Sequence, residues 1–246
     1  MYFKNQPLLA TAPLVPARPF RNPLPGGTLG AMAQTFNRIG GLVQQLSAAT
    51  GIDAVAVLAV WLIETGGRAC RPEQALLRFE VHQFYRHWGR ANEALFDRHF
   101  QFGGHAGTPG KNLANHRMRE DPAGTWSSVH SGKLRERAAF ALAERLGGTE
   151  AAALASRFGW PQIMGSHHTD CGYPDATSLR AAFNADERWQ ALGFFDFCAS
   201  NALLDLIRTN QWKRFGQAYN GDGDTYGPKL ADAWAHRDAL LALPRD

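Results

Sequence analysis

The chain has 246 residues, of which 45% are hydrophobic, and its formal net charge is +4. This length suits one medium-sized domain or one domain with a small appendage, and the apolar content excludes wholesale disorder. The cysteines Cys70, Cys171 and Cys198 lie far apart and form no CxxC motif, so neither a disulfide scaffold nor a zinc knuckle is expected. We expect buried, inert thiols in a chain that folds in a reducing compartment.

The excess positive charge is confined to the first part of the chain. Residues 1–52 contain no Asp or Glu and carry four of the 26 basic residues, so the other 22 basic residues balance the 22 acidic ones. A nucleic-acid-binding protein instead clusters Lys and Arg over a folded face. We therefore expect no nucleic-acid partner, and we expect the basic N-terminal part to attract an anionic cell envelope or a delivery partner.

Residues 1–27 form a distinct N-terminal arm, which precedes a domain expected over residues 28–246. The arm holds six of the 13 prolines and ends in Pro-Gly-Gly, which predicts an extended, weakly structured segment. The alternative is an arm that packs on the domain. No run reaches the roughly 18–20 apolar residues of a membrane span, and prolines interrupt the apolar stretch that a signal peptide would need. We expect synthesis in the cytoplasm without a cleaved leader.

Helical patterns dominate the domain. A helix is expected from Thr28 to about residue 49, and Asp53 is placed to cap a second helix over residues 54–65. The second helix is apolar almost all round, which is typical of a helix in the core of a domain. Further helices are expected over residues 81–88, 132–146, 149–155, 185–210, 212–219 and 229–243.

Strand signals are nearly absent from the chain. A short apolar run covers residues 76–79. Residues 101–132 are rich in Gly, His, Asn and Ser and show little periodicity, which predicts a long irregular excursion with room for a small β-hairpin. The predicted fold class is therefore mainly α.

Glu64 is the most informative single residue. It follows ten residues without a charge and lies at the C-terminal end of the apolar helix, where the helix dipole is negative. Low dielectric and the dipole both disfavour the carboxylate and would raise its pKa, as a general acid near neutral pH requires. The alternative is an ordinary carboxylate at a helix end that faces solvent.

Glu80 is the second candidate carboxylate. It lies within an apolar and aromatic run, shortly before His82. An acid in such a run is either functional or paired with a base, for which Arg78 and Arg86 are the nearest choices in sequence.

Two further segments carry polar groups suited to ligand binding. Gln162 stands between bulky apolar residues and two glycines, where its amide can reach a polar ligand, although it could equally begin a helix. Tyr219 and Asn220 offer a stacking face and an amide, which are typical of sugar recognition. Their alternative role is to end a helix, with Asn220 or Gly221 in the left-handed conformation.

Taken together, four segments resemble in their order the motifs of the N-acetylmuramidase family of phage endolysins, a branch of the lysozyme-like superfamily. The segments are LAVWLIETGG, LLRFEVHQFYR, FGWPQIMG followed by CGY, and FGQAYNG followed by YGPKLADAW. They match the family's Glu-Ser-Gly-Gly, Phe-Glu-x-His-x-Phe, Gly-x-x-Gln-Ile-Met-Gly and Tyr-Asn-Gly motifs, and the resemblance covers about 200 of the 246 residues. Four motifs in one order are far more specific than any one alone.

The resemblance implies a lysozyme-like helical fold with the substrate between two lobes. It implies hydrolysis of the β-1,4 bond between N-acetylmuramic acid and N-acetylglucosamine in peptidoglycan, for bacterial cell lysis. Glu64 matches the family's catalytic acid, and Glu80 is our choice for the second catalytic carboxylate, with substrate positioning as its alternative role. The expected substrate-binding residues are Thr65, His82, Gln162, Tyr219 and Asn220.

Some features depart from the family pattern. Thr65 replaces the usual Ser, and Trp160-Pro161 replaces a more usual apolar pair, which could reshape the floor of the cleft. Many members carry an N-terminal peptidoglycan-binding domain of three helices, for which the arm leaves no room. Retaining, inverting and lytic transglycosylase outcomes all stay open, as do chitin cleavage and a non-catalytic glycan-binding or virion structural module.

We expect no metal and no cofactor. The histidines form no HExxH motif, and the nearest clusters, His167-His168 with Asp170 and His99 with His105, match no known ligand spacing. The segment GDGDTYG lacks the spacing of an EF-hand loop. The expected partner is the glycan strand of peptidoglycan, met by a monomer after holin release or after delivery by a virion or a secretion system.

Overall fold

The computed structural model describes residues 2–65, 76–105 and 113–246. The chain forms two compact units, each with its own core. Unit 1 draws on residues 1–72, 170–172 and 186–246, and unit 2 on residues 73–169 and 173–185. Among the described residues, none of the helices combines the length and the hydropathy of a membrane span.

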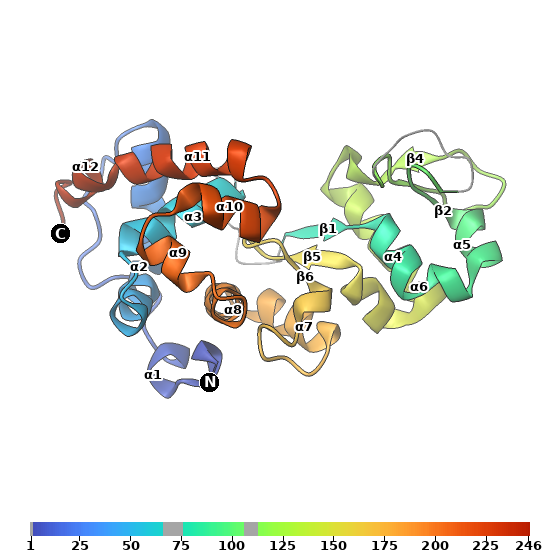
Figure 1. The fold of residues 1–246 in the computed structure, drawn as a ribbon, viewed down its shortest axis with the longest axis horizontal. Helices are drawn as coiled ribbons and strands as arrows, with labels where there is room; N and C mark the ends of the chain where they lie inside the picture. The colour runs from blue at the N-terminus through green and yellow to red at the C-terminus, as the bar shows by residue number, and fades with distance from the viewer. Residues whose placement is uncertain (1, 66–75, 106–112) are drawn as a thin grey trace. The chain divides into compact units, whose positions relative to one another are not determined.

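Unit 1 is built from helices. In Figure 1, α10 and α11 run side by side, and α3 packs against both α2 and α11. The helices expected over residues 28–49, 54–65 and 212–219 are confirmed. The elements of unit 1 are the 3-10 turn η1 (Phe3–Asn5) and the helices α1 (Pro7–Ala10), α2 (Gly27–Thr50), α3 (Ala54–Thr65), α8 (Glu187–Ser200), α9 (Leu204–Arg208), α10 (Trp212–Asn220), α11 (Gly223–Ala235) and α12 (Arg237–Leu241).

Helix α3 is the centre of unit 1. Every residue from Val55 to Trp61 exposes 2% or less of its surface, so the helix is buried on all sides as its composition predicts. Asp53 caps it, since the Asp53 carboxylate accepts a hydrogen bond from the backbone N–H of Val55 at 2.8 Å. Each fully buried Val or Leu contributes about 1.5–3 kcal/mol, so this helix is a main source of the unit's stability.

The N-terminal arm packs on unit 1. Phe20 exposes 2% of its surface, and its ring centroid lies 4.9 Å from that of Phe36 on α2. The Asn37 side chain accepts from the backbone N–H of Phe20 and donates to its carbonyl, at 2.6 and 2.8 Å. Leu9 is buried, and Arg188 of α8 donates to its carbonyl at 3.3 Å. The expectation of a weakly structured arm is therefore wrong, and its packed alternative describes residues 2–26.

Two of the four basic residues of the acid-free segment form ion pairs inside unit 1, and a third contacts a backbone carbonyl. Arg21 pairs with the C-terminal residue Asp246 at 3.0 Å, and Arg18 donates to the Asp246 carbonyl at 3.3 Å. Arg38 on α2 pairs with Glu187 of α8 at 2.8 Å. These contacts reduce the positive charge that the arm can offer to an anionic surface.

The C-terminal helices differ from the sequence prediction. The single helix expected over residues 185–210 is wrong, because Ala202 has a φ of 56° and this left-handed residue separates α8 from α9. The helix expected from residue 229 begins earlier, at Gly223. The Asp222 side chain caps it by accepting from the backbone N–H of Thr225 at 2.9 Å.

The described cysteines behave as inert thiols. Cys171 and Cys198 are free and buried in unit 1. Burial raises the pKa of both thiols above the usual range, so neither is a thiolate near neutral pH. Cys70 lies outside the described residues.

Unit 2 combines helices with two small antiparallel sheets. One sheet has the strand order β1-β5-β6 and the other β2-β3-β4. Its elements are β1 (Leu77–Phe79), α4 (Val81–His87), η2 (Gly89–Ala91), α5 (Glu93–His99), β2 (Phe100–Gln101), β3 (Arg117–Met118), β4 (Ser127–Ser128), η3 (Val129–Ser131), α6 (Lys133–Leu154), β5 (Ser156–Phe158), β6 (Ile163–Met164), η4 (Gly165–His167) and α7 (Ala176–Ala185).

The sequence predicted β-structure where one of the two sheets lies but not where the other lies. The β2-β3-β4 sheet spans the irregular region in which a hairpin was expected. The β1-β5-β6 sheet was not expected, because strands of two or three residues are too short to show an alternating pattern. Helix α6 merges the two helices predicted on either side of residues 147–148 and departs from helical geometry at Gly148, whose φ is 84°.

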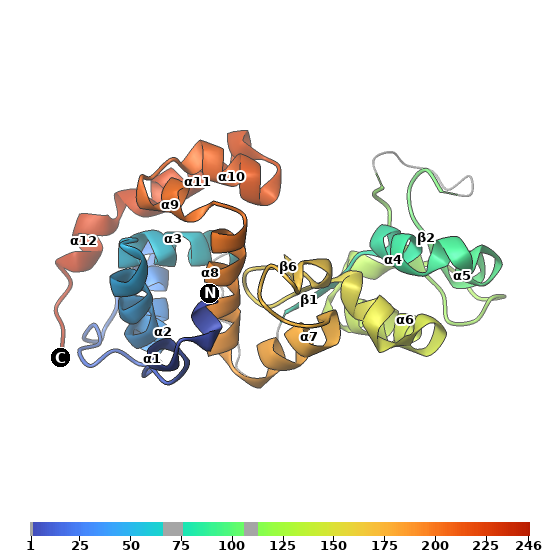
Figure 2. The same cartoon turned by 60° about the horizontal axis from the view of Figure 1, so that its bottom comes forward.

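An aromatic cluster forms the core of unit 2. Phe84 and Phe100 have ring centroids 5.3 Å apart, Phe79 and Phe100 5.8 Å, and Phe79 meets the Phe140 ring edge-on at 6.4 Å. Each of these rings exposes 3% or less of its surface. The cluster joins β1, α4, β2 and α6, and Figure 2 shows α4 directly above α6 in that view.

The packed arm leads to a stability prediction. Phe20→Ala is expected to lower the free energy of unfolding by about 3–5 kcal/mol, because it leaves a cavity against Phe36. Urea denaturation of the full chain measures this. The matched control is Leu8→Ala on the same arm, where the side chain is 69% exposed and the change should stay within about 0.5 kcal/mol. Equal effects of the two substitutions would contradict a packed arm.

Candidate active site

The last turn of α3 presents Glu64 to α11. The Glu64 side chain is half-buried, and the Tyr226 hydroxyl donates a hydrogen bond to its Oε1 atom. The packing of α3 against α11 brings together residues that are 162 positions apart in the chain. Glu64 therefore does not project freely into solvent from its helix end.

Two tyrosine hydroxyls interact with this carboxyl. Burial is the main cause that raises the pKa of Tyr226 above its usual range, and the nearby Glu64 charge and the hydrogen bond to Glu64 add to it. Burial and the Glu64 charge likewise raise the pKa of Tyr219. Both phenols therefore keep their protons, and Tyr226 stays a hydrogen-bond donor to Glu64 at every pH near neutrality.

A cavity of about 660 Å³ opens beside Glu64 within unit 1. Glu64 and Asn220 are the sequence-predicted residues that line it. Tyr226 and Lys229 also line it and were not among the predicted site residues. Their spacing of three residues on a helix was the available signal, since such residues share one face. The full lining is Gly27, Thr28, Ala31, Leu62, Ile63, Glu64, Asn220, Tyr226 and Lys229.

Tyr219 and Asn220 take different positions. The Tyr219 ring stacks on Phe215 at 5.2 Å and meets Phe194 edge-on at 5.7 Å, so aromatic side chains of unit 1 occupy much of its surface. Asn220 is exposed and ends α10, while Gly221 follows with a φ of 78° as the helix C-cap. Thr65 is the last residue of α3.

Glu80 lies in unit 2, at the N-terminus of α4. It exposes 6% of its surface, and its Oε1 atom accepts from Arg78 Nε at 3.1 Å and from Arg157 Nε at 3.2 Å. Burial alone would raise its pKa, but Arg157, His116 and Arg78 outweigh burial and hold the pKa below the usual value of 4.5. Glu80 is therefore a fixed, ionised carboxylate, and Arg78 is the partner that the sequence suggested.

Three histidines of unit 2, His82, His116 and His130, lie next to Glu80 or next to one another. His116 Nδ1 lies 3.5 Å from Glu80 Oε2, and His82 Nδ1 lies 3.8 Å from the same oxygen. His116 Nε2 lies 2.7 Å from the Leu113 carbonyl, which only accepts, so Nε2 carries the hydrogen and Nδ1 accepts. His130 Nε2 then donates to His116 Nδ1 at 2.7 Å, and His130 Nδ1 lies 2.6 Å from the Glu136 carboxylate.

The donor atoms of Glu80, His82 and His116 lie close enough to consider a metal site. Both nitrogens of His116 already have hydrogen-bond partners, and two arginines neutralise Glu80. A divalent cation would have to displace these partners. The hydrogen-bond network accounts for the cluster without a metal.

Gln162 occupies the turn between β5 and β6, so the alternative that it begins a helix is wrong. Its φ of 51° is unusual for a residue with a side chain, and its Nε2 donates to the Gly159 carbonyl at 2.7 Å. The turn therefore holds the Gln162 amide group in one orientation. Among the described residues, its amide oxygen accepts no hydrogen bond.

The histidine network predicts a pH dependence of stability. Burial is the largest cause that lowers the pKa of His116, to about 4. The charges of His130 and His82 also lower this pKa, and the charge of Glu80 raises it. The unfolded chain binds this proton near pH 6.5, so stability is present above that value and falls by at most about 3 kcal/mol as the pH drops toward 4. His82, whose pKa burial also lowers, acts with the same sign.

His116→Gln is expected to flatten this dependence. Urea denaturation at pH 7.5 and pH 5 gives the difference in the free energy of unfolding for each protein. The control is His236→Gln in unit 1, which should keep the slope of the unaltered protein. An unchanged slope in His116→Gln would contradict the assignment.

Two comparisons with known proteins agree with this architecture. The family model described as Muramidase, N-acetylmuramidase, matches residues 53–237. The chain is also similar to the crystal structure of Burkholderia AP3 phage endolysin, with a TM-score of 0.61 and 25% sequence identity over 81% of this chain and 70% of that chain. No curated protein sequence matches the chain.

The fold and the resemblance noted in the sequence are consistent with these findings. The structure is mainly helical, as expected, and it carries small antiparallel sheets. The matched range contains both Glu64 and Glu80, and it extends through the helix that supplies Tyr226. Because the family model covers more than half of its length, the chain belongs to the N-acetylmuramidase family and is a glycoside hydrolase of peptidoglycan.

Proposed function

We propose that Glu64 is the general acid that protonates the glycosidic oxygen between N-acetylmuramic acid and N-acetylglucosamine. The observation that carries the proposal is the half-buried Glu64 carboxyl, which lines a cavity of about 660 Å³ and accepts a hydrogen bond from Tyr226. A general acid needs a partly desolvated carboxyl within reach of substrate, and this cavity supplies both conditions.

Tyr226 has two effects in this mechanism. Its hydroxyl holds the Glu64 carboxyl in one orientation before reaction. When Glu64 gives its proton to the leaving oxygen, it becomes a carboxylate, and a hydrogen bond to a charged acceptor is stronger than one to a neutral group. The donor therefore stabilises the developing charge more than the starting acid. Water then captures the oxocarbenium-like centre on the sugar.

The remaining expected residues have supporting roles in the proposal. Asn220 and Lys229 line the Glu64 cavity and are available to bind sugar hydroxyl or carboxylate groups. Tyr219, packed on Phe215, supports the wall beneath Glu64. Thr65 and Gln162 are proposed as substrate contacts, the latter through its amide oxygen.

Glu80 is proposed as a positioning residue, together with His82. A carboxylate that two arginines hold with a lowered pKa is a poor proton donor, and its Oε1 atom already accepts from both arginines. It anchors the junction of β1 with α4, where β5 supplies Arg157. As the second carboxylate of the reaction, Glu80 would have to leave these partners.

The cellular setting is part of the same proposal. Peptidoglycan lies outside the cytoplasmic membrane, so the protein acts there after release through a holin pore or delivery by a virion or a secretion system. Each described unit has its own apolar core, which supports a monomer as the active form.

The role of Glu64 can be tested directly. Glu64→Gln keeps the size of the side chain but cannot donate the proton, so kcat on purified peptidoglycan is expected to fall by about 10²–10⁴-fold. Glu120→Gln, at an exposed acid of unit 2, is the matched control and should retain full activity. Retained activity in Glu64→Gln would overturn the assignment, and binding without turnover in the unaltered protein would favour a glycan-binding module. Mass spectrometry of the products separates reducing ends from anhydro ends.

Tyr226→Phe removes one hydroxyl and tests the donor. The carboxylate form of Glu64 loses stabilisation, so the alkaline limb of the pH–activity profile is expected to move to higher pH. At the pH optimum, kcat is expected to fall by about tenfold to a hundredfold, the range for a hydrogen bond to a charged group. Tyr85→Phe is the matched control, because it removes an exposed tyrosine–glutamate hydrogen bond to Glu93. A profile that superimposes on that of the unaltered enzyme would contradict the role of Tyr226.

A further inference from the structure

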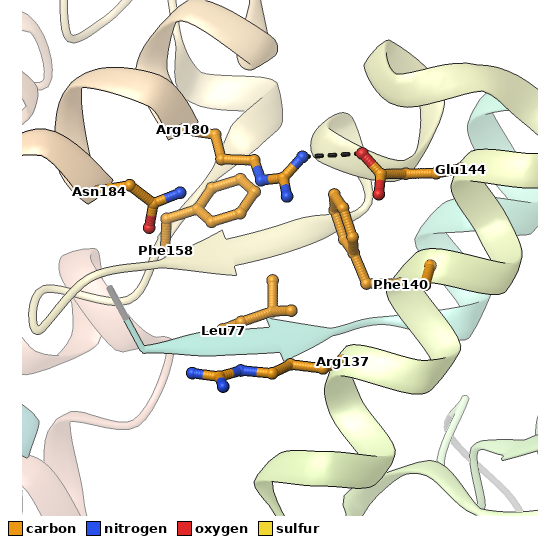
Figure 3. Close-up of a pocket in the computed structure, with 8 residues that line it drawn as sticks. Leu77, Arg137, Phe140, Glu144, Phe158, Arg180 and Asn184 are labelled. Carbon is orange, nitrogen blue, oxygen red and sulfur yellow. Dashed lines mark hydrogen bonds and ion pairs between the residues drawn. The ribbon is translucent and has the colours of Figure 1, made fainter. Parts of the chain in front are cut away.

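Unit 2 contains a second cavity that the proposed reaction does not use. Its volume is about 260 Å³, somewhat below the range for drug-sized ligands, so it suits a small group. Figure 3 shows aromatic and aliphatic side chains pointing into the space between two strands and two helices. The lining residues are Leu77, Arg137, Phe140, Ala141, Glu144, Phe158, Arg180 and Asn184.

The secondary structure explains why these residues meet. On α6, Arg137, Phe140 and Glu144 recur at three and four residues and so share one face of the helix. Leu77 of β1 pairs in register with Phe158 of β5, which places both side chains on the same face of the sheet. Helix α7 supplies Arg180 and Asn184 in the same way, one turn apart.

Only two of the three charged residues that line this cavity form an ion pair with each other. Arg180 pairs with Glu144 at 2.8 Å, and its guanidinium lies 4.2 Å from the centre of the Phe140 ring. Arg137 is exposed and has neither an ion-pair nor a hydrogen-bond partner among the described residues. Figure 3 places Arg137 and the Arg180–Glu144 pair on opposite sides of the apolar groups. The cavity thus offers one open cation, an apolar floor and, opposite, an ion pair.

We propose that this cavity binds a short peptide that ends in a free carboxylate. Arg137 is the counter-ion of the carboxylate, and a small apolar side chain of the peptide covers Leu77, Phe140 and Phe158. The Glu144 carboxylate accepts hydrogen bonds from peptide N–H groups, and the Asn184 amide donates to peptide carbonyls. The inference rests on the proposed function, because the stem peptides of peptidoglycan are short, rich in small residues and end in a carboxylate.

Charge complementarity favours this occupant over a bare sugar. In intact peptidoglycan the lactyl carboxyl of a peptide-bearing N-acetylmuramic acid is bound in an amide, so the glycan strand itself is uncharged there and would leave the Arg137 guanidinium without a counter-ion. A guanidinium pairs with carboxylates through two parallel hydrogen bonds. A simple inorganic anion would leave the apolar floor uncovered. A peptide carboxylate next to a methyl group satisfies both features of the cavity.

Peptide binding can be measured without catalysis. A synthetic peptide ending in D-alanyl-D-alanine is titrated into the full chain by calorimetry, alongside the same peptide with an amidated C-terminus and inorganic phosphate. The unaltered protein should bind the free acid, and Arg137→Gln should weaken that binding by about twofold to fivefold, the range for a solvent-exposed ion pair. Arg135→Gln is the matched control, since it removes the same charge from an exposed position on the same helix outside the cavity.

A second readout uses turnover. The ratio of kcat/KM between Arg135→Gln and Arg137→Gln is measured on intact peptidoglycan and on peptidoglycan whose free carboxylates have been converted to amides with a carbodiimide and ammonia. The ratio should exceed one on the intact polymer, through a higher KM of Arg137→Gln, and should return to one on the amidated polymer.

Three results would overturn the proposal: equal binding of the amidated and free-acid peptides, equal loss in the two arginine variants, or phosphate binding as tight as that of the peptide. Absence of cleavage on both polymers would instead count against the proposed function. The peptide titration would still decide whether the cavity binds a peptide carboxylate.

Discussion

A carboxyl group at the end of an otherwise uncharged, buried helix needs a hydrogen-bond partner, and here the Tyr226 hydroxyl donates that hydrogen bond. Helix α3 is buried on all sides because its residues are apolar on all sides. Its packing against α11 then delivers Glu64 to a donor from the far end of the chain. The same burial keeps Tyr226 protonated, so the hydrogen bond and the cavity have a common origin in the core of unit 1.

The N-terminal arm is a packed part of unit 1 and not a loose extension of it. Proline and acid-free composition suggested a loose, positively charged lead, but Phe20 and Leu9 are core residues and Asp246 pairs with Arg21. The junction of the arm with α2 also supplies Gly27 and Thr28 to the lining of the Glu64 cavity. The arm is therefore part of the structure that carries the candidate acid. Its removal would disturb folding before it revealed any effect of charge.

Unit 2 shows how one small sheet can serve two purposes. Near one end of β1, Glu80 gathers Arg78, Arg157 and the histidines into a buried network. Between β1 and β5 on one side and α6 and α7 on the other, Leu77 and Phe158 help to form the floor of the second cavity. A buried ionic network is stable only when every member has a partner. Such a network holds the short strands in register, although strands of this length would be marginal alone.

The sequence by itself determined the helical class, the buried character of α3 and the cap at Asp53, and it singled out Glu64 as the candidate acid, because each follows from local periodicity and charge. It also determined the family, since four motifs recur in one order. Only the tertiary structure decided that Tyr226 meets Glu64, that Arg157 and His116 meet Glu80, and that Gln162 lies in a turn. The contacts of Glu64 and Glu80 join residues far apart in the chain, and local propensity contains no information about them. The turn at Gln162 depends on the pairing of two strands too short to show a pattern. The paired state of Glu80, the packed arm and the cavity beside Arg137 are products of packing, which selects partners only after the helices and strands have met.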